Sequence, residues 1–220
     1  MAVWENTASL FDLPHASFDA VIGVDEVGRG ALFGPVTVGA VYLTRTLCTQ
    51  LSSQDWLHKV NDSKLLNAAQ RTKVAPLLAN FFSHAIQHTA VSYLDRYNIS
   101  RAVDRGIYKS VQKILEKVEI PLERVYVLFD GKIIPHYPQL LLQKPMPFLK
   151  CEVKADRHFF PVAAASILAK VARDTLIARA AERFPQYGLE KHAGYGTQRH
   201  RQAIIEYGLT KFHRRSFRVS

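Results

Sequence analysis

The glycine-rich stretch at residues 21–35 constrains the fold of this chain more than any other. It opens as an apolar strand and then carries two adjacent acids, Asp25 and Glu26, where a buried strand would otherwise continue. Adjacent strand residues point to opposite faces, so one carboxylate must face whatever covers the sheet. A buried carboxylate needs a cation or hydrogen-bond donors. Two interpretations fit this stretch alone: a strand that ends in a polar turn, and a metal-binding strand end.

The residues that follow the two acids add a second signal. Gly28, Arg29 and Gly30 leave the main chain almost without side-chain cover. A ligand can therefore approach its N–H and C=O groups closely. The stretch predicts acids for a metal ion beside a bare backbone for a nucleic acid.

Composition narrows the class of protein. The 220 residues suit one domain with a sizeable core. The 29 Lys and Arg against 19 Asp and Glu give a formal charge of +10, which favours a polyanionic partner. Two cysteines without metal-type spacing predict neither a disulfide framework nor a zinc site. No signal peptide or membrane span is evident, and we expect a cytoplasmic monomer.

Apolar patterning predicts an α/β order of elements. Strands are expected at residues 21–27, 36–43, 85–94, 124–129 and 148–153. Helices are expected after a cap at Asp62 or Ser63, at 99–118, from 163 onward, and at 198–207 with Thr197 as cap. We divide the chain into an N-terminal arm at 1–19, a catalytic domain at 20–183, and a helical, basic segment at 184–220.

Two further acids follow buried strands. Asp130 comes directly after the strand at 124–129, and Asp156 comes just after the strand at 148–153. Open α/β sheets usually place their sites at such strand ends. Oxygen ligands without His or Cys favour Mg²⁺ or Mn²⁺. Two such ions roughly 3.5–4 Å apart can cleave a phosphodiester, whereas separated acids alone could serve a glycosidase. The positive charge and the glycine-rich loop at residues 28–35, called the glycine loop below, favour a phosphate substrate.

Seven motifs in this order resemble the ribonuclease HII family, also called type 2 ribonuclease H. They are GVDEVGRG at 23–30, NDSK at 61–64, FDG at 129–131, KAD at 154–156, AAASILAK at 163–170 with RD at 173–174, GY at 194–195, and HRRSF at 213–217. Together they cover nearly the whole chain. Three positions depart from the family pattern: Ala31 and Phe33 stand where Pro and Ala are expected, and Ala155 stands where Gly is more common.

The resemblance implies a ribonuclease H-like fold, with a mixed sheet of about five strands flanked by helices and a small helical C-terminal appendage. It implies an endonuclease that hydrolyses the RNA strand of RNA–DNA hybrids. It also implies cleavage 5′ to single ribonucleotides embedded in duplex DNA, by a two-metal mechanism that leaves 3′-hydroxyl and 5′-phosphate ends. The implied partners are therefore RNA–DNA hybrids and ribonucleotide-containing duplex DNA.

The resemblance also assigns site residues. The implied metal-binding acids are Asp25, Glu26, Asp130 and Asp156, with Asp25 bridging both ions. Asp174 competes for the fourth place, but it lies four residues after Lys170 and can form a helical ion pair. The implied substrate contacts are Gly28, Arg29 and Gly30 at the ribose, Ser63 and Lys64 at phosphates, and Tyr195 against the following sugar.

Other functions remain open on the sequence alone. A DNA-cutting relative of the same fold, such as a junction resolvase or an integrase, would share the acids. A non-catalytic module for RNA or hybrid duplexes would share the basic C-terminal segment, where basic residues alternate with aromatic ones.

Overall fold

The computed structural model describes residues 3–11, 18–51, 54, 56–57, 60, 66–118, 120–132 and 148–219. The strands are β1 (Ala20–Val27), β2 (Val36–Thr44), β3 (His84–Thr89), β4 (Val125–Asp130) and β5 (Phe148–Glu152). The α-helices are α1 (Val3–Leu10), α2 (Arg45–Leu51), α3 (Ala68–Phe81), α4 (Val91–Val118), α6 (Ala155–His158), α7 (Phe160–Arg183), α8 (Leu189–His192) and α9 (Gln198–Tyr207). Short 3₁₀ turns lie at Leu122–Arg124 and Pro185–Tyr187.

The five strands form one mixed sheet in the order β3-β2-β1-β4-β5. β1 pairs with β2, and β2 with β3, in antiparallel register. β4 lies parallel to β1, and β5 parallel to β4. The sheet and its flanking helices confirm the predicted α/β, ribonuclease H-like architecture.

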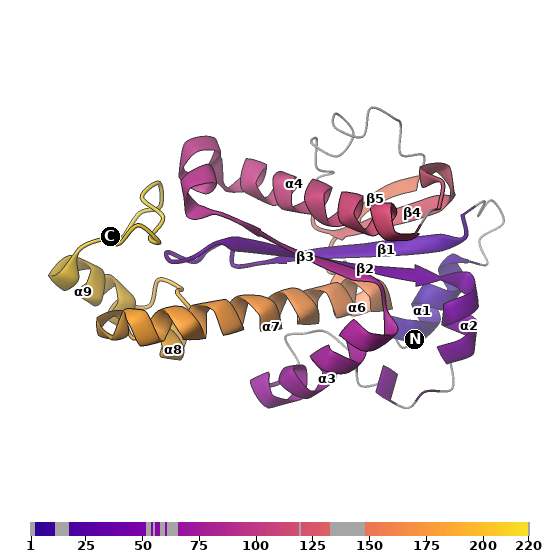
Figure 1. Cartoon of the computed structure of the whole chain (residues 1–220), viewed down its shortest axis with the longest axis horizontal. Coiled ribbons are helices and arrows are strands. Elements are labelled where there is room, and N and C mark those ends of the chain that lie inside the picture. Colours follow the sequence, from indigo (N-terminus) through magenta and orange to yellow (C-terminus); the bar gives the residue numbers. More distant parts are fainter. Residues whose placement is uncertain are drawn as a thin grey trace.

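Helices cover both faces of the sheet (Figure 1). One face packs Ile22, Val24 and their neighbours against α4. The other face packs Val21, Val41 and Leu128 against α7, with α1 and α3 completing that layer. Burial on both faces explains why β1 and β4 are nearly continuous apolar runs.

Helix α7 approaches the sheet at two glycines. A Cβ on Gly23 of β1 would lie 2.3 Å from the Pro161 carbonyl carbon, and one on Gly39 of β2 would lie 2.4 Å from the Ala165 oxygen. Alanines 163, 164, 165 and 169 on the helix are fully buried. Small residues on both partners therefore allow backbone-to-backbone contact. Gly39 pairs with Asp25 across the β1–β2 ladder, so this contact lies beside the predicted metal-binding acid.

Three predicted elements have different boundaries in the structure. The strand predicted at 85–94 ends at Thr89, and Val91 begins α4, because a short apolar run fits a buried helix as well as a strand. α4 changes direction at Asn98, whose φ is 74°, and the helix predicted at 99–118 is its second part. A helix, α2, occupies Arg45–Leu51, between the strand predicted at 36–43 and the helix predicted after Asp62 or Ser63, where the sequence predicted no element.

The cap predicted for α3 was also wrong. The helix begins at Ala68, and Asn67 forms its N-cap rather than Asp62 or Ser63. The Asn67 side chain accepts from the Gln70 N–H, and the Gln70 side chain accepts from the Asn67 N–H. This reciprocal capping box decides the start of the helix.

The C-terminal segment packs against the glycine loop. The N–H groups of Leu32 and Phe33 donate to the Gly194 carbonyl, and the Arg214 N–H donates to the Leu32 carbonyl. Bridges Ala31–Tyr195 and Phe33–His213 flank these bonds. Loop residues Leu32 and Phe33 share a core cluster with Tyr187, Leu189 and Ile204 of the C-terminal segment.

The division into residues 1–19, 20–183 and 184–220 stays a prediction, although α7 ends at Arg183. Within the described ranges, no helix is long and apolar enough to cross a membrane.

Replacing Gly23 with alanine tests the contact between α7 and the sheet. The added methyl group would overlap the backbone at Pro161 and Val162, and overpacking of this kind costs about 1–3 kcal/mol. We expect the midpoint of thermal unfolding to fall by roughly 2–10 °C for a chain of this length. Gly30→Ala is the control, because its methyl meets no atom within 4 Å. Equal unfolding midpoints for the two variants would contradict the packing argument.

Candidate active site

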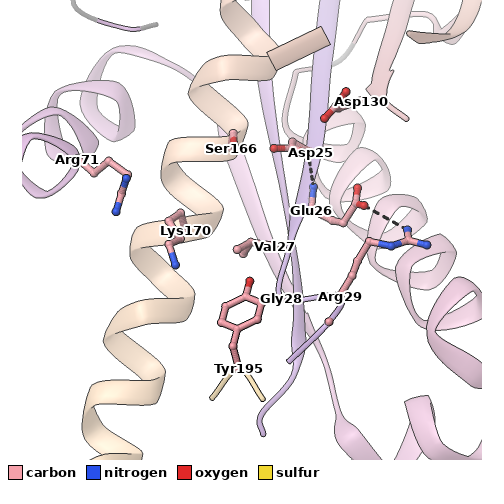
Figure 2. A pocket seen from close by; sticks show the side chains of 11 residues that line it. Asp25, Glu26, Val27, Gly28, Arg29, Arg71, Asp130, Ser166, Lys170 and Tyr195 are labelled. Carbon is pink, nitrogen blue, oxygen red and sulfur yellow. Dashed lines mark hydrogen bonds and ion pairs between the residues drawn. The ribbon is translucent and has the colours of Figure 1, made fainter. Parts of the chain in front are cut away.

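Three aspartates from separate elements meet at one end of the sheet. Asp25 lies on β1, Asp130 is the last residue of β4, and Asp156 lies on α6. One carboxylate oxygen from each lies within 4.8 Å of the others. Figure 2 shows the Asp25 and Asp130 side chains close together beside α7. β1 and β4 run parallel with Val24 opposite Phe129, so their carboxyl ends deliver Asp25 and Asp130 side by side.

Asp130 also connects the two segments that carry the other partners. Its Oδ1 accepts a hydrogen bond of 3.0 Å from the Ala155 N–H. Lys154 adopts a left-handed conformation with φ of 63°, and this turns the chain from β5 directly into α6. Asp156 is fully buried as a result.

The electrostatics of the cluster fit a bound cation. Burial, and then the neighbouring charge of Glu26, raise the pKa of Asp25 well above its usual range, while a hydrogen bond with the Ser166 side chain opposes them. Asp130 and Asp156 raise the pKa of Asp25 further. A divalent ion would stabilise the ionised carboxylates, and a set of carboxylate oxygens is the donor set that Mg²⁺ and Mn²⁺ prefer.

Glu26 shares the cavity but not the cluster of three aspartates. Its side chain points away from α7 in Figure 2, as strand alternation requires. Its Oε1 accepts from Arg29 Nη1 at 3.2 Å. Burial raises the pKa of Glu26, and the charge of Arg29 opposes that shift. The sequence therefore predicted four acids at the site, and the structure places three together with Glu26 beside them.

Asp174 lies apart from the aspartate cluster. Its Oδ1 accepts from Lys170 Nζ at 2.9 Å, the helical ion pair that the spacing predicted. Asp156 rather than Asp174 stands with Asp25 and Asp130 among the described residues. That Asp156 is a metal ligand stays a prediction.

A cavity of about 380 Å³ opens beside the aspartates. Its lining includes Asp25, Glu26, Val27, Gly28, Arg29, Gly30, Arg71, Asp130, Ser166, Lys170 and Tyr195. Sequence reasoning missed the contributions of Arg71, Ser166 and Lys170. The four-residue spacing of Ser166 and Lys170 was a signal that both occupy one face of α7. Arg71 carried none, because only the packing of α3 brings it here. Ser63 and Lys64 lie outside the described residues.

The two glycines that flank Arg29 have different structural reasons. Gly28 is buried with φ of 88°, and a Cβ there would lie 2.2 Å from Arg173 Nε. Gly28 is thus required by the fold itself. Gly30 is exposed, has no positive φ, and a Cβ there would meet nothing within 4 Å. The fold does not require glycine at position 30. The absence of a side chain there instead leaves room for a ligand to approach the main chain.

The basic C-terminal segment is only partly a surface. His200, His213 and Arg214 are buried, contrary to the predicted nucleic-acid surface. Burial and the neighbouring His200 lower the pKa of His213 to about 4, so His213 is neutral at pH 7. The two imidazoles face each other at 3.2 Å between their Nε2 atoms, and His200 Nδ1 contacts the Tyr195 carbonyl at 3.0 Å. His200 thus contacts the main chain of Tyr195, and His213 contacts His200.

Residues 22–220 match the family model of ribonuclease HII. Curated relatives of that name include one from Prochlorococcus marinus, 40% identical over 200 residues that cover 89% of this chain and 94% of the relative. Another, from Zymomonas mobilis, is 39% identical over 93% of this chain and 89% of its own length.

This chain belongs to the ribonuclease HII family. It is a ribonuclease H, an endonuclease that acts on RNA–DNA hybrids. Membership removes the glycosidase alternative.

Solved structures agree on the fold. The chain resembles the ribonuclease in the PCNA:RNase HII complex from Archaeoglobus fulgidus, with a TM-score of 0.67 at 26% identity over 90% of this chain and 95% of that one. It resembles ribonuclease H2 from Pyrococcus horikoshii with a TM-score of 0.72 at 23% identity, over 91% and 94% of the two chains. Ala31 and Phe33, which we expected to depart from the family pattern, are buried. Phe33 packs against Phe184, Phe212 and His213.

Asp25→Asn should stabilise the metal-free protein. A raised pKa in the folded state means that the folded protein holds this proton more tightly than the unfolded chain does. Stability is therefore lost as pH rises from the unfolded pKa through the folded one, and Asn removes the loss. We expect the unfolding midpoint in EDTA at pH 7 to rise by about 2–4 °C for each kcal/mol recovered. Mg²⁺ or Mn²⁺ should raise the midpoint of the parent more than that of the variant.

Gly30→Ala should separate function from folding. The added methyl group meets no protein atom, so the unfolding midpoint should stay within about 2 °C of the parent. Cleavage should fall at least about tenfold, because the methyl group would occupy the ligand's approach to the backbone. Gly28→Ala should instead lower the unfolding midpoint. Full activity of Gly30→Ala would contradict the prediction that the substrate contacts the main chain at this position.

Proposed function

We propose that this ribonuclease HII family member also cuts 5′ to a single ribonucleotide embedded in duplex DNA and leaves 3′-hydroxyl and 5′-phosphate ends. The observation that carries the proposal is that exposed Gly30 and half-buried Tyr195 line the same cavity as Asp25 and Asp130, which lie together with Asp156. Such an arrangement puts a ribose reader and a hydrolytic centre within one bound nucleotide.

Asp25, Glu26, Asp130 and Asp156 would hold two divalent ions, Mg²⁺ or Mn²⁺, with Asp25 shared between them. Such ions, when bound, activate a water and stabilise the leaving oxygen of an in-line phosphodiester displacement. A related structure of Bst-RNase HIII was solved in complex with Mn²⁺, at 21% identity, where only the fold is shared.

The protein's own residues orient the substrate. The main chain at Gly28, Arg29 and Gly30 would contact the 2′-hydroxyl, which both donates and accepts hydrogen bonds. Arg71 and Lys170 line the same cavity. They would neutralise the phosphates on either side of the bound ribonucleotide. Ser63 and Lys64 keep their predicted role as phosphate contacts.

Tyr195 would lie against the sugar that follows the ribonucleotide. Its ring has Lys170 Nζ at 6.0 Å and Arg173 Cζ at 5.4 Å from its centroid, and its hydroxyl points into the cavity in Figure 2. A 2′-hydroxyl on that sugar would crowd the ring, which makes recognition of the RNA-to-DNA junction partly steric.

We infer a monomer that works in the cytoplasm on RNA–DNA hybrids and on duplex DNA that contains ribonucleotides, in DNA replication and repair.

The decisive assay is cleavage of a duplex that contains one ribonucleotide. With Mg²⁺ or Mn²⁺ we expect one cut at the 5′ side of the ribonucleotide, with ends identified by their mobility after phosphatase treatment. EDTA should abolish the cut, and a matched all-DNA duplex should stay intact. A protein that cuts long RNA–DNA hybrids but never this duplex would refute the junction proposal and leave the family assignment standing.

Two aspartate variants test the metal-ligand set with the same substrate. Asp156→Asn should lose on the order of 10²–10⁴ in rate, since removal of a ligand costs several kcal/mol of transition-state stabilisation and each 1.36 kcal/mol is tenfold. Asp174→Asn, which alters the ion pair with Lys170, should stay within about tenfold of the parent. Equal losses in the two variants would argue for Asp174 as the fourth acid.

A further inference from the structure

Arg214 is a buried arginine that reaches the glycine loop from the C-terminal segment. Its side chain is 1% exposed. Nη1 donates to the Arg29 carbonyl at 2.7 Å, and Nε donates to the Gly34 carbonyl at 3.0 Å. The guanidinium thus joins the two ends of the loop through its main chain.

The Arg29 carbonyl belongs to the same peptide unit as the Gly30 N–H. A peptide unit is planar and trans, so the oxygen and the hydrogen point in opposite directions. A hydrogen bond that fixes the oxygen on Arg214 therefore also fixes the direction of the Gly30 N–H. Charge-assisted bonds of this kind are short and strong, and a polarised carbonyl makes the N–H of its own peptide a better donor.

Several carbonyl groups of the loop are hydrogen-bonded within the protein, whereas two of its N–H groups are not bonded to any described residue. The carbonyls of Arg29, Phe33, Gly34 and Pro35 all accept from Arg173 or Arg214. In the described structure, the N–H groups of Arg29 and Gly30 have no acceptor, and both residues are exposed. The arginines thus hold the carbonyls inward and leave the N–H groups at the cavity.

Burial of two guanidinium groups, unpaired among the described residues, lowers the stability of the fold, so a purely structural role does not explain them well. Arg173 is fully buried and donates only to carbonyls, of Pro35, Phe33 and Ala193. In the part of the chain that is described, neither arginine forms an ion pair, and Arg214 Nη2 donates to nothing. Burial and the charge of Arg173 lower the pKa of Arg214 to about 10. Buried cations without a carboxylate partner destabilise a fold, and a carbonyl can be bonded by a neutral donor.

We propose that Arg214 is a positioning residue for ribose recognition: by bonding the Arg29 carbonyl, it aims and polarises the Gly30 N–H toward the substrate's 2′-oxygen. This inference rests on the proposed function and names the Gly30 main-chain nitrogen as the donor to the ribose. Arg173 supports the same loop at Phe33 and Pro35 and ties it to Ala193, two residues before Tyr195. Arg173 therefore connects the glycine loop to the segment that carries Tyr195.

The test measures binding rather than turnover. Affinity is compared for two duplexes that differ only in one ribonucleotide against one deoxyribonucleotide, in EDTA so that neither is cut. The readout is the ratio of the two dissociation constants. For Arg214→Gln we expect this ratio to fall at least about fivefold toward unity, because the N–H loses a charge-assisted orientation. A merely structural defect would reduce the fraction of active protein and leave the ratio unchanged.

Arg215→Gln is the matched control. Arg215 is exposed, and the change removes the same charge one residue away. We expect it to weaken binding to both duplexes alike, with a salt dependence that becomes less steep, and to keep the ratio of the parent. Gly30→Ala should abolish the preference, since it blocks the same donor.

The outcomes separate the two proposals. A parent protein that binds both duplexes equally overturns ribose reading itself. A parent that discriminates, together with an Arg214→Gln variant that discriminates equally well, overturns only the role of Arg214. If Arg214→Gln does not fold, Arg214→Lys replaces it: the charge stays, but one ammonium cannot reproduce the planar two-carbonyl contact. A reduced ratio for folded Arg214→Lys supports the proposal, and an undiminished ratio overturns it.

Discussion

The close approach of α7 to the sheet is the contact on which the rest of this structure depends. Gly23 and Gly39 allow the helix backbone to touch β1 and β2, and the buried alanines on α7 complete the fit. The same contact sets Ser166 beside Asp25 and brings Lys170 to the cavity. It also carries Arg173 to the underside of Gly28. One helix thus provides the wall of the site and one of the two arginines that hold its loop.

The site brings together two groups of like charge, one acidic and one basic. Three aspartates converge at one end of the sheet, where burial and then the neighbouring carboxylates raise the pKa of Asp25. Two buried arginines donate to carbonyls of the glycine loop. Each group is unfavourable for folding without a ligand. In the proposed function, the acids would hold the divalent ions and the loop would supply backbone donors for a ribose beside them. Stability is lowered where substrate and metal ions would restore it.

The C-terminal segment has a role in the site that its composition did not suggest. Its motif HRRSF at 213–217 looks like a solvated basic tail. His213 and Arg214 are in fact internal, the first against His200 and the second against the glycine loop. Leu32 and Phe33 from the loop complete the apolar cluster of this segment. The loop and the segment therefore form one packed unit, although about 150 residues lie between residue 35 and residue 184.

The sequence by itself determined the elements and the acids. Apolar periodicity located most strands and helices, and strand ends marked Asp25, Asp130 and Asp156, because local pattern and residue chemistry carry that information. The spacing also predicted the ion pair of Asp174 with Lys170. Only the tertiary structure showed that Asp25, Asp130 and Asp156 lie together and that Glu26 is not among them. It alone distinguished Gly28 from Gly30 and turned Arg214 inward. Those outcomes depend on which distant segments meet, and burial, rather than composition, decides whether a cation faces water or a carbonyl.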